Sequence, residues 1–128
     1  MARAVVDASA VIALLRDEPG AELVASYAGD AIISSVNLQE VVKALLVRGF
    51  AIDLACTMIE ALHLEVRSHE KADAYGAASL HEATREYGSG LGDRSCMALA
   101  IAVSLPVLTT DKAWSKLAIP GLTVLLAR

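Results

Sequence analysis

Residues 4–16, Ala4-Val-Val-Asp-Ala-Ser-Ala-Val-Ile-Ala-Leu-Leu-Arg16, join a short β-branched apolar run to a longer apolar segment, with an acid at the junction. The run Ala4–Asp7 has the composition of a buried strand. The segment Ala8–Arg16 is predicted to be a helix, which Asp17-Glu-Pro-Gly20 would end. This stretch therefore predicts a strand followed directly by a helix, as in a βαβ unit.

The rest of the chain repeats this alternation of strands and helices. Further strands are predicted at Ala31–Ser34, Leu64–Arg67, Pro106–Thr110 and Leu122–Leu126, and helices at Ala21–Ala28, Ser35–Arg48, Asp53–Leu62, His69–Tyr87, Arg94–Ser104 and Lys112–Leu117. Strands that alternate with helices imply parallel βαβ units, and their almost continuous apolar character fits strands covered on both faces. We therefore expect a three-layer α/β/α fold with a central parallel sheet, as a single domain over residues 1–128.

Composition narrows the class of protein. The chain has 128 residues, 55% of them hydrophobic, and a mean hydropathy of +0.52, which excludes a disordered protein. No apolar run reaches the roughly 18 residues that a membrane-spanning helix requires, and Asp7 interrupts the apolar N-terminus too early for a signal peptide. Cys56 and Cys96 are expected to be buried free thiols in a reducing cytoplasm. The net charge of −4 argues weakly against generic nucleic-acid binding.

A glycine-rich stretch precedes the apolar helix predicted at residues 94–104. Residues 88–93, Gly88-Ser-Gly-Leu-Gly-Asp93, begin like the dinucleotide-binding pattern G-x-G-x-x-G. Asp93 stands where that pattern requires its third glycine. The glycines instead allow a tight turn that sets the Asp93 carboxylate at the start of the helix.

Four acids follow the ends of predicted strands or begin the helices beside them. Asp7 ends the first strand and Asp111 ends the fourth, while Glu40 lies in the first turns of the helix after the second strand and Asp93 lies at the mouth of the helix that leads into the fourth strand. Ligands of open α/β sheets bind at the carboxyl ends of the strands. If the first and fourth strands are neighbours at the middle of the sheet, all four carboxylates converge on that edge.

Each acid also has a simpler interpretation as a helix cap. Asp7, Asp93 and Asp111 could each be an N-cap, and Glu40 could complete a capping box with Asn37 as N-cap. Four clustered carboxylates, however, repel one another and require a positive charge among them. Oxygen ligands without His or Cys favour Mg²⁺ or Mn²⁺, and one or two such ions would largely cancel the charge of the four acids.

Around these acids the sequence resembles the PIN-domain family, and within it the VapC-type toxins of bacterial and archaeal toxin–antitoxin pairs. The matching segments are Val5-Val-Asp-Ala-Ser-Ala10, Ser34-Ser-Val-Asn-Leu-Gln-Glu-Val41, Leu91-Gly-Asp-Arg-Ser-Cys-Met-Ala-Leu-Ala100 and Val107-Leu-Thr-Thr-Asp-Lys-Ala-Trp114. They follow the order and spacing of the family along nearly the whole chain. The resemblance implies a five-stranded parallel sheet, a divalent-metal active site, endoribonuclease activity, a VapB-type antitoxin partner and a homodimer.

The resemblance also implies a role for each acid. Asp7 and Asp93 are expected to be the most direct metal ligands, and Glu40 and Asp111 to hold waters or a second ion. A bound ion would lower the pKa of a coordinated water and stabilise charge on the scissile phosphate. Cleavage of the RNA would then leave a 5′-phosphate and a 3′-hydroxyl.

Neutral and basic residues near the acids are further candidates. Ser9, Asn37 and Thr110 could orient the ligands and waters by hydrogen bonds, or could cap the starts of helices. Phosphate contacts could come from Lys43, Arg94, Lys112 and Lys116, whose alternative is ordinary solvated charge. His63, His69 and His81 show no ligand spacing, and Trp114 is expected to be a packing residue.

Two other functions compete with a nuclease. A catalytically silent α/β interaction module would use the four acids only as caps. A phospho-acceptor receiver domain would require an acidic pair after the first strand and an acceptor Asp after the third. The chain has a single Asp7 at the first position and Arg67-Ser68 at the second, so the receiver hypothesis fails.

Overall fold

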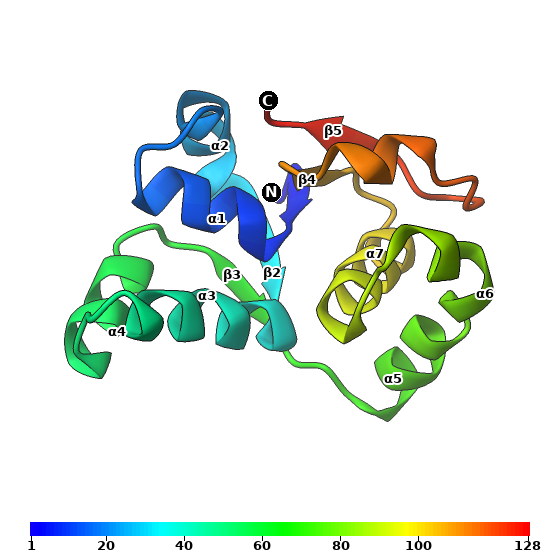
Figure 1. Cartoon of the computed structure of the whole chain (residues 1–128), viewed down its shortest axis with the longest axis horizontal. Coiled ribbons are helices and arrows are strands. Elements are labelled where there is room, and N and C mark those ends of the chain that lie inside the picture. The colour runs from blue at the N-terminus through cyan, green and yellow to red at the C-terminus, as the bar shows by residue number, and fades with distance from the viewer.

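The computed structural model describes residues 1–128 and contains one sheet of five parallel strands. The strands are β1 (Ala4–Val6), β2 (Ala31–Ser34), β3 (Glu65–Arg67), β4 (Val107–Thr109) and β5 (Val124–Leu126), in the spatial order β3-β2-β1-β4-β5 (Figure 1). The predicted α/β class and the neighbouring first and fourth strands are confirmed. β1, β3, β4 and β5 are each one or two residues shorter than predicted at one or both ends, and β2 is as predicted.

The register of the central strands brings two of the acidic segments side by side. Val5 pairs with Ile32 of β2 and with Val107 of β4, and Val6 pairs with Leu108. One step further, the Asp7 N–H donates to the Leu108 carbonyl at 3.0 Å. The carboxyl ends of β1 and β4 therefore meet at the middle of the sheet, where the order of the strands reverses.

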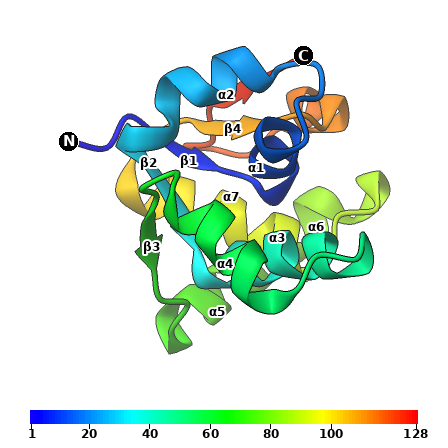
Figure 2. The same cartoon turned by 90° about the vertical axis from the view of Figure 1, so that its left-hand side faces the viewer.

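Helices cover both faces of the sheet and make three layers, which Figure 1 shows side by side and Figure 2 shows from one face. One face of the sheet is covered by α1 (Ala8–Leu15), α2 (Ala21–Tyr27), α3 (Ser35–Val47) and α4 (Ile52–Glu60). The opposite face is covered by α7 (Leu91–Val103) and the 3₁₀ turn η3 (Lys112–Lys116). Successive strand residues point to opposite faces, so Val6 packs under the first layer and Val5 under α7. This two-sided burial explains the apolar character of β1, β2 and β4, whereas β3 at the edge of the sheet is exposed and carries two charged residues.

The single helix predicted over residues 69–87 is wrong. The segment forms α5 (Lys71–Ala78), α6 (His81–Thr84) and the 3₁₀ turn η2 (Arg85–Tyr87). Gly76 is a poor helix former, and the Ser79 hydroxyl donates to the Gly76 carbonyl at 2.6 Å. Such local bonds from serine compete with a continuing helix, and α5 ends there and packs against α7 instead of the sheet.

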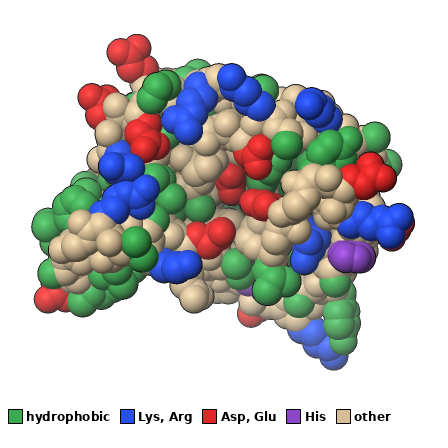
Figure 3. All heavy atoms as spheres, viewed as in Figure 1, with side chains coloured by type: hydrophobic (Ala, Val, Ile, Leu, Met, Phe, Trp, Pro, Cys, Tyr) green, Lys and Arg blue, Asp and Glu red, His purple; other side chains and the backbone are tan.

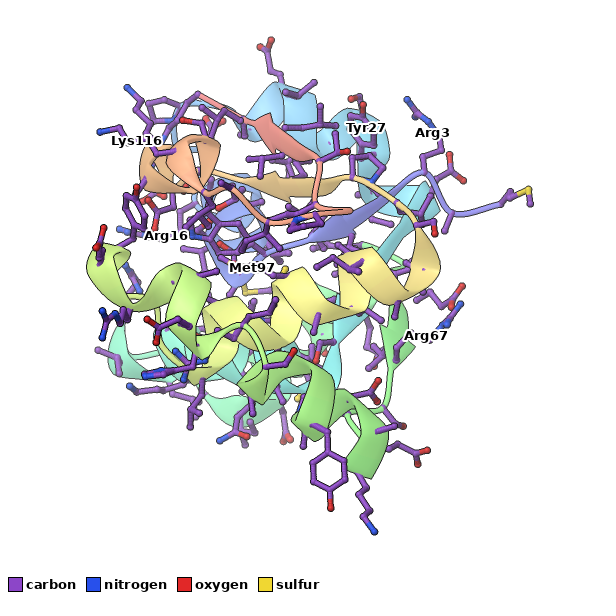
Figure 4. The ribbon with its side chains drawn as sticks, turned by 90° about the vertical axis from the view of Figure 1, so that its right-hand side faces the viewer. Arg3, Arg16, Tyr27, Arg67, Met97 and Lys116 are labelled. Atoms are coloured by element: carbon purple, nitrogen blue, oxygen red, sulfur yellow. The ribbon has the colours of Figure 1, made fainter.

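A second core lies between the sheet and α7, and it contains one of the two thiols predicted to be buried. Trp114 is 1% exposed and belongs to this core together with Met97 and Cys96, which confirms its packing role. Figure 4 shows Met97 pointing from α7 toward the sheet. Cys56 is exposed on α4, so the prediction that both thiols are buried is wrong for this residue. None of the helices combines the length and the apolar character that crossing a membrane requires.

Candidate active site at the carboxyl edge of the sheet

The four acids line one pocket of about 390 Å³ at the carboxyl edge of the sheet, between α1, α3 and α7. In Figure 3, acidic side chains gather in the hollow at the centre of this face, with basic side chains around it. We call this site the acidic pocket, lined by Asp7, Ala8, Ser9, Ile12, Glu40, Lys43, Ala44, Val47, Arg48, Asp93 and Asp111. The structure thus brings together carboxylates that are up to 104 positions apart in the chain.

Asp7 forms the floor of the acidic pocket. Its side chain is buried, and its Oδ2 atom accepts hydrogen bonds from Ser9 Oγ at 2.7 Å and Thr109 Oγ1 at 2.9 Å. Asp7 occupies the N-cap position of α1, but its side chain makes no capping bond. Burial raises the pKa of Asp7 to about 6, with smaller contributions from the charges of Asp93 and Glu40, although both hydroxyls oppose the shift. A carboxylate in this position requires a nearby positive charge.

The hydroxyl network around Asp7 corrects one predicted residue. Ser9 Oγ accepts from the Thr110 backbone N–H at 3.1 Å, and Thr109 Oγ1 accepts from the Asp111 N–H at 3.1 Å. Thr110 therefore reaches the site through its backbone, while the hydroxyl at Asp7 comes from Thr109. The sequence could not separate these neighbours, because a shift of one residue in strand register exchanges the faces of the sheet.

Glu40 is held from α3 by a buried amide. The helix begins at Ser35 with Ser34 as N-cap, so the predicted alternative with Asn37 as N-cap is wrong. Asn37 Nδ2 donates to Glu40 Oε1 at 2.7 Å and to the Gly92 carbonyl at 2.9 Å. Since both partners are acceptors, the amide nitrogen must face them. Asn37 thus joins the start of α3 to the first turn of α7, and its buried Oδ1 has no protein partner.

Asp93 and Asp111 approach the acidic pocket from the other side. Helix α7 begins three residues earlier than predicted, so Asp93 lies in its first turn and accepts from the Gly90 N–H at 3.2 Å. Burial raises the pKa of Asp93, and the nearby Asp111 adds to the effect, while the hydrogen bond from Gly90 and the charge of Arg94 oppose it. Asp111 caps η3 by accepting from the Ala113 N–H at 3.0 Å, so a capping role and a place in the pocket coexist.

The glycine-rich turn has the geometry that its sequence indicates. Gly88 follows η2 with a φ of 67°, a left-handed conformation that favours glycine. Gly90 then precedes α7 in an extended conformation. The chain reverses within a few residues and presents Asp93 at the sheet edge.

The donor set fits a hard divalent cation. It consists of carboxylates from four elements, none of which forms an ion pair with a basic side chain within 4.0 Å. No three His, Cys, Asp or Glu side chains are arranged to hold one ion directly. An ion here would therefore contact one or two carboxylates and complete its coordination with water, as Mg²⁺ commonly does.

Comparison with known protein families identifies the family of this chain. The model of the PIN domain matches residues 4–120. The chain belongs to the PIN-domain family.

Solved structures share the fold of this PIN domain. A chain of DNA-bound VapBC from Salmonella typhimurium gives a TM-score of 0.75 at 18% identity, over 100% of both chains. A chain of a toxin–antitoxin complex from Klebsiella pneumoniae gives 0.74 at 20% identity, over 98% of each chain. PAE2754 from Pyrobaculum aerophilum gives 0.64 at 18% identity, over 96% of this chain and 90% of its own. No curated protein matches the sequence.

Basic residues are distributed unevenly around the acidic pocket of the PIN domain. Of the four predicted phosphate contacts, Lys43 alone lines the acidic pocket. Arg94 lines a separate hollow between α5 and α7, together with His69 and His81. Lys112 and Lys116 lie exposed outside the pocket, and Figure 4 shows Lys116 pointing away from η3 into solvent.

Arg48 lines the acidic pocket of the PIN domain but was not predicted from the sequence. It follows Glu40 by eight positions and Ala44 by four, so it continues the face of α3 that carries the pocket. Extending that helical face by two turns would have found it.

Replacing Asn37 by alanine tests whether the buried amide positions Glu40. We expect the free energy of unfolding to fall by about 1–3 kcal/mol, since the change removes the two hydrogen bonds that the buried Asn37 amide donates, each worth about 1 kcal/mol. The affinity for Mn²⁺ should fall roughly 10- to 100-fold, as for other residues that orient ligands. Urea unfolding and calorimetric titration of Mn²⁺ measure the two effects. Gln39→Ala, at an exposed neighbour on α3, is the control, and equal Mn²⁺ affinity in both variants would contradict the positioning role.

Proposed function

We propose that this PIN domain is a metal-dependent endoribonuclease and the VapC-type toxin of a toxin–antitoxin pair. The observation that carries the proposal is the cluster of four carboxylates without basic partners in one pocket, one of them buried with a pKa raised to about 6. Burial makes the ionised forms of Asp7 and Asp93 costly unless a cation occupies the pocket. The alternative is a catalytically silent PIN-like interaction module, in which the acids would serve as caps.

Asp7 and Asp93 would contact a bound Mg²⁺ or Mn²⁺ directly, and Glu40 and Asp111 would act through waters or hold a second ion. When bound, the ion supplies a Lewis acid that lowers the pKa of water and neutralises charge on the scissile phosphate. The hydroxyls of Ser9 and Thr109 keep the Asp7 carboxylate in place. RNA cleavage would leave a 5′-phosphate and a 3′-hydroxyl.

Lys43 would support this chemistry from the rim of the acidic pocket. It lies one turn after Glu40 on the same face of α3, and no carboxylate pairs with it within 4.0 Å. A phosphate next to the scissile one could therefore take up its charge. The acids would hold the cation at the scissile phosphate, and Lys43 would bind a neighbouring phosphate of the strand.

A VapB-type antitoxin and a second copy of the chain complete the proposal. Structural relatives include VapBC from Salmonella typhimurium and from Rickettsia felis, each described as bound to DNA. Exposed apolar side chains beside the acidic pocket, where α3 leads into α4, support a protein partner: Leu46, Val47, Ile52 and Leu54. The isolated chain should run as a dimer in light scattering, and a monomer at all working concentrations would contradict the dimer.

Mapping of RNA 5′ ends after brief expression tests the nuclease directly. Wild-type protein should create new 5′-phosphate ends at defined sites, and Asp93→Asn should create none, because a carboxylate in the pocket is lost without a change of shape. Asp53→Asn, an exposed acid at the start of α4, is the control for charge. New ends that appear equally with Asp93→Asn would sink the nuclease and favour the silent module.

A further inference from the structure

Two cations beside the acidic pocket have no carboxylate partner. Lys43 and Arg48 line the pocket with the four acids, yet neither forms an ion pair within 4.0 Å. The Arg48 guanidinium donates Nη1 to the Ala44 carbonyl at 3.0 Å and retains its other donors. Both charges therefore remain available to an anion that enters from outside.

Arg48 also belongs to a second depression, which we call the outer hollow. It has a volume of about 460 Å³, shares Arg48 with the acidic pocket, and is lined by Leu15, Arg16, Leu45, Arg48, Phe50 and Met58. These residues come from the carboxyl ends of α1 and α3, the loop after α3, and α4. No carboxylate lines the outer hollow. Arg16 forms an ion pair at 3.1 Å with Glu18, which lies outside the lining.

The chemistry of the outer hollow matches a nucleobase. An aromatic ring, a thioether and aliphatic side chains form an apolar surface, and two guanidinium groups lie among them. Bases bind proteins by stacking on aromatic rings and guanidinium planes, and Arg recognises phosphate through several donors. A neutral base and the charged backbone beside it would use both parts of this surface.

From this continuity we infer that the outer hollow is a nucleotide subsite of the proposed ribonuclease. One base of the RNA strand lies against Phe50 and Met58, and Lys43 and Arg48 bind phosphates between that base and the scissile bond. The inference rests on the proposed function and adds the path of the strand along α3. It predicts a base preference at one position beside the cleaved bond.

Charge favours RNA over a protein as the occupant. The unpaired Arg48 attracts a polyanion, whereas a basic segment of a protein would find no carboxylate in the lining of the outer hollow. The exposed apolar residues Leu46, Ile52 and Leu54 lie outside the linings of both the acidic pocket and the outer hollow. They remain available to an antitoxin while RNA occupies the hollow.

Cleavage of a randomised single-stranded RNA library tests the subsite. Phe50→Leu keeps an apolar side chain for folding but removes the stacking ring, and should reduce the base preference at one flanking position at least about threefold. Arg48→Gln should lower kcat/KM about tenfold and reduce its dependence on salt. Lys71→Gln, on α5 away from both pockets, should match wild type. Unchanged preference and salt dependence in both variants would overturn the subsite.

Binding without catalysis separates this inference from the nuclease itself. A fluorescent six-nucleotide RNA of random sequence is titrated into Asp93→Asn, with and without Phe50→Leu or Arg48→Gln. The second change should raise Kd at least about fivefold, the lower end for loss of one stacked base, whether or not wild type cleaves RNA. Equal Kd values, or no RNA binding, would reject the subsite. Weaker antitoxin binding by Phe50→Leu with unchanged RNA binding would assign the hollow to a protein.

Discussion

Replacing Asp7 by asparagine is expected to stabilise the metal-free protein by up to about 3 kcal/mol at pH 7. The folded protein holds the Asp7 pKa at about 6 instead of 3.8, mainly because the carboxylate is buried, and this difference corresponds to about 3 kcal/mol. Asparagine removes the charge and keeps an oxygen that can accept from Ser9 and Thr109. The same change should reduce RNA cleavage at least about 100-fold, the scale of one lost electrostatic contact to a transition state.

The pH dependence has a defined sign. Because folded Asp7 binds its proton more tightly than the unfolded chain does, its contribution to stability is complete below pH 3.8 and is lost as the pH rises through about 6. Urea unfolding in a chelator should therefore show the gain from Asp7→Asn near pH 7 and little gain near pH 4.

Two further observations decide whether a cation is the missing partner of Asp7. Mn²⁺ should raise the Tm of wild type more at pH 7 than at pH 5, since it binds the ionised carboxylate, and should raise that of Asp7→Asn much less. Asp53→Asn should follow wild type throughout. A metal-free Asp7→Asn protein that is less stable than wild type at pH 7 would refute the assignment of a buried, uncompensated charge.

Replacing Gly92 by alanine is expected to reduce cleavage about 100-fold while leaving stability within about 1 kcal/mol of wild type. A Cβ atom at Gly92 would overlap the Glu40 carboxylate, which must then move away from Asn37. This carboxylate ends a flexible side chain, and alanine favours the helix over glycine, so folding tolerates the change. A shift of about 1 Å at a catalytic group can cost about 100-fold in rate.

Gly90→Ala is the matched control for Gly92→Ala. A Cβ at Gly90 has no neighbour within 4 Å, and the backbone there is extended, so both activity and stability should remain close to those of wild type. Cleavage of a fluorescent RNA and urea unfolding measure the two quantities for both variants. If Gly92→Ala cleaves as fast as Gly90→Ala, the position of Glu40 beside Gly92 is unimportant for catalysis.

The sequence determined the fold class and the gathering of the acids. Apolar β-branched runs and helical patterns are local signals, and their alternation leaves few arrangements other than a parallel sheet between helices. Residues that follow such strands must lie at the carboxyl edge. Asp7 and Asp111 could therefore be placed there without coordinates, as could Glu40 and Asp93 at the starts of the neighbouring helices.

Only the tertiary structure decided how that edge is built. Strand register selected Thr109 over Thr110, and the approach of α3 to α7 placed Asn37 between Glu40 and the Gly92 carbonyl. Helix α5 packs against α7 where one long helix was predicted, and Arg48 lies between two pockets. Each of these contacts joins residues on different elements, and the relative placement of elements depends on the packing of the whole core, which no local pattern encodes.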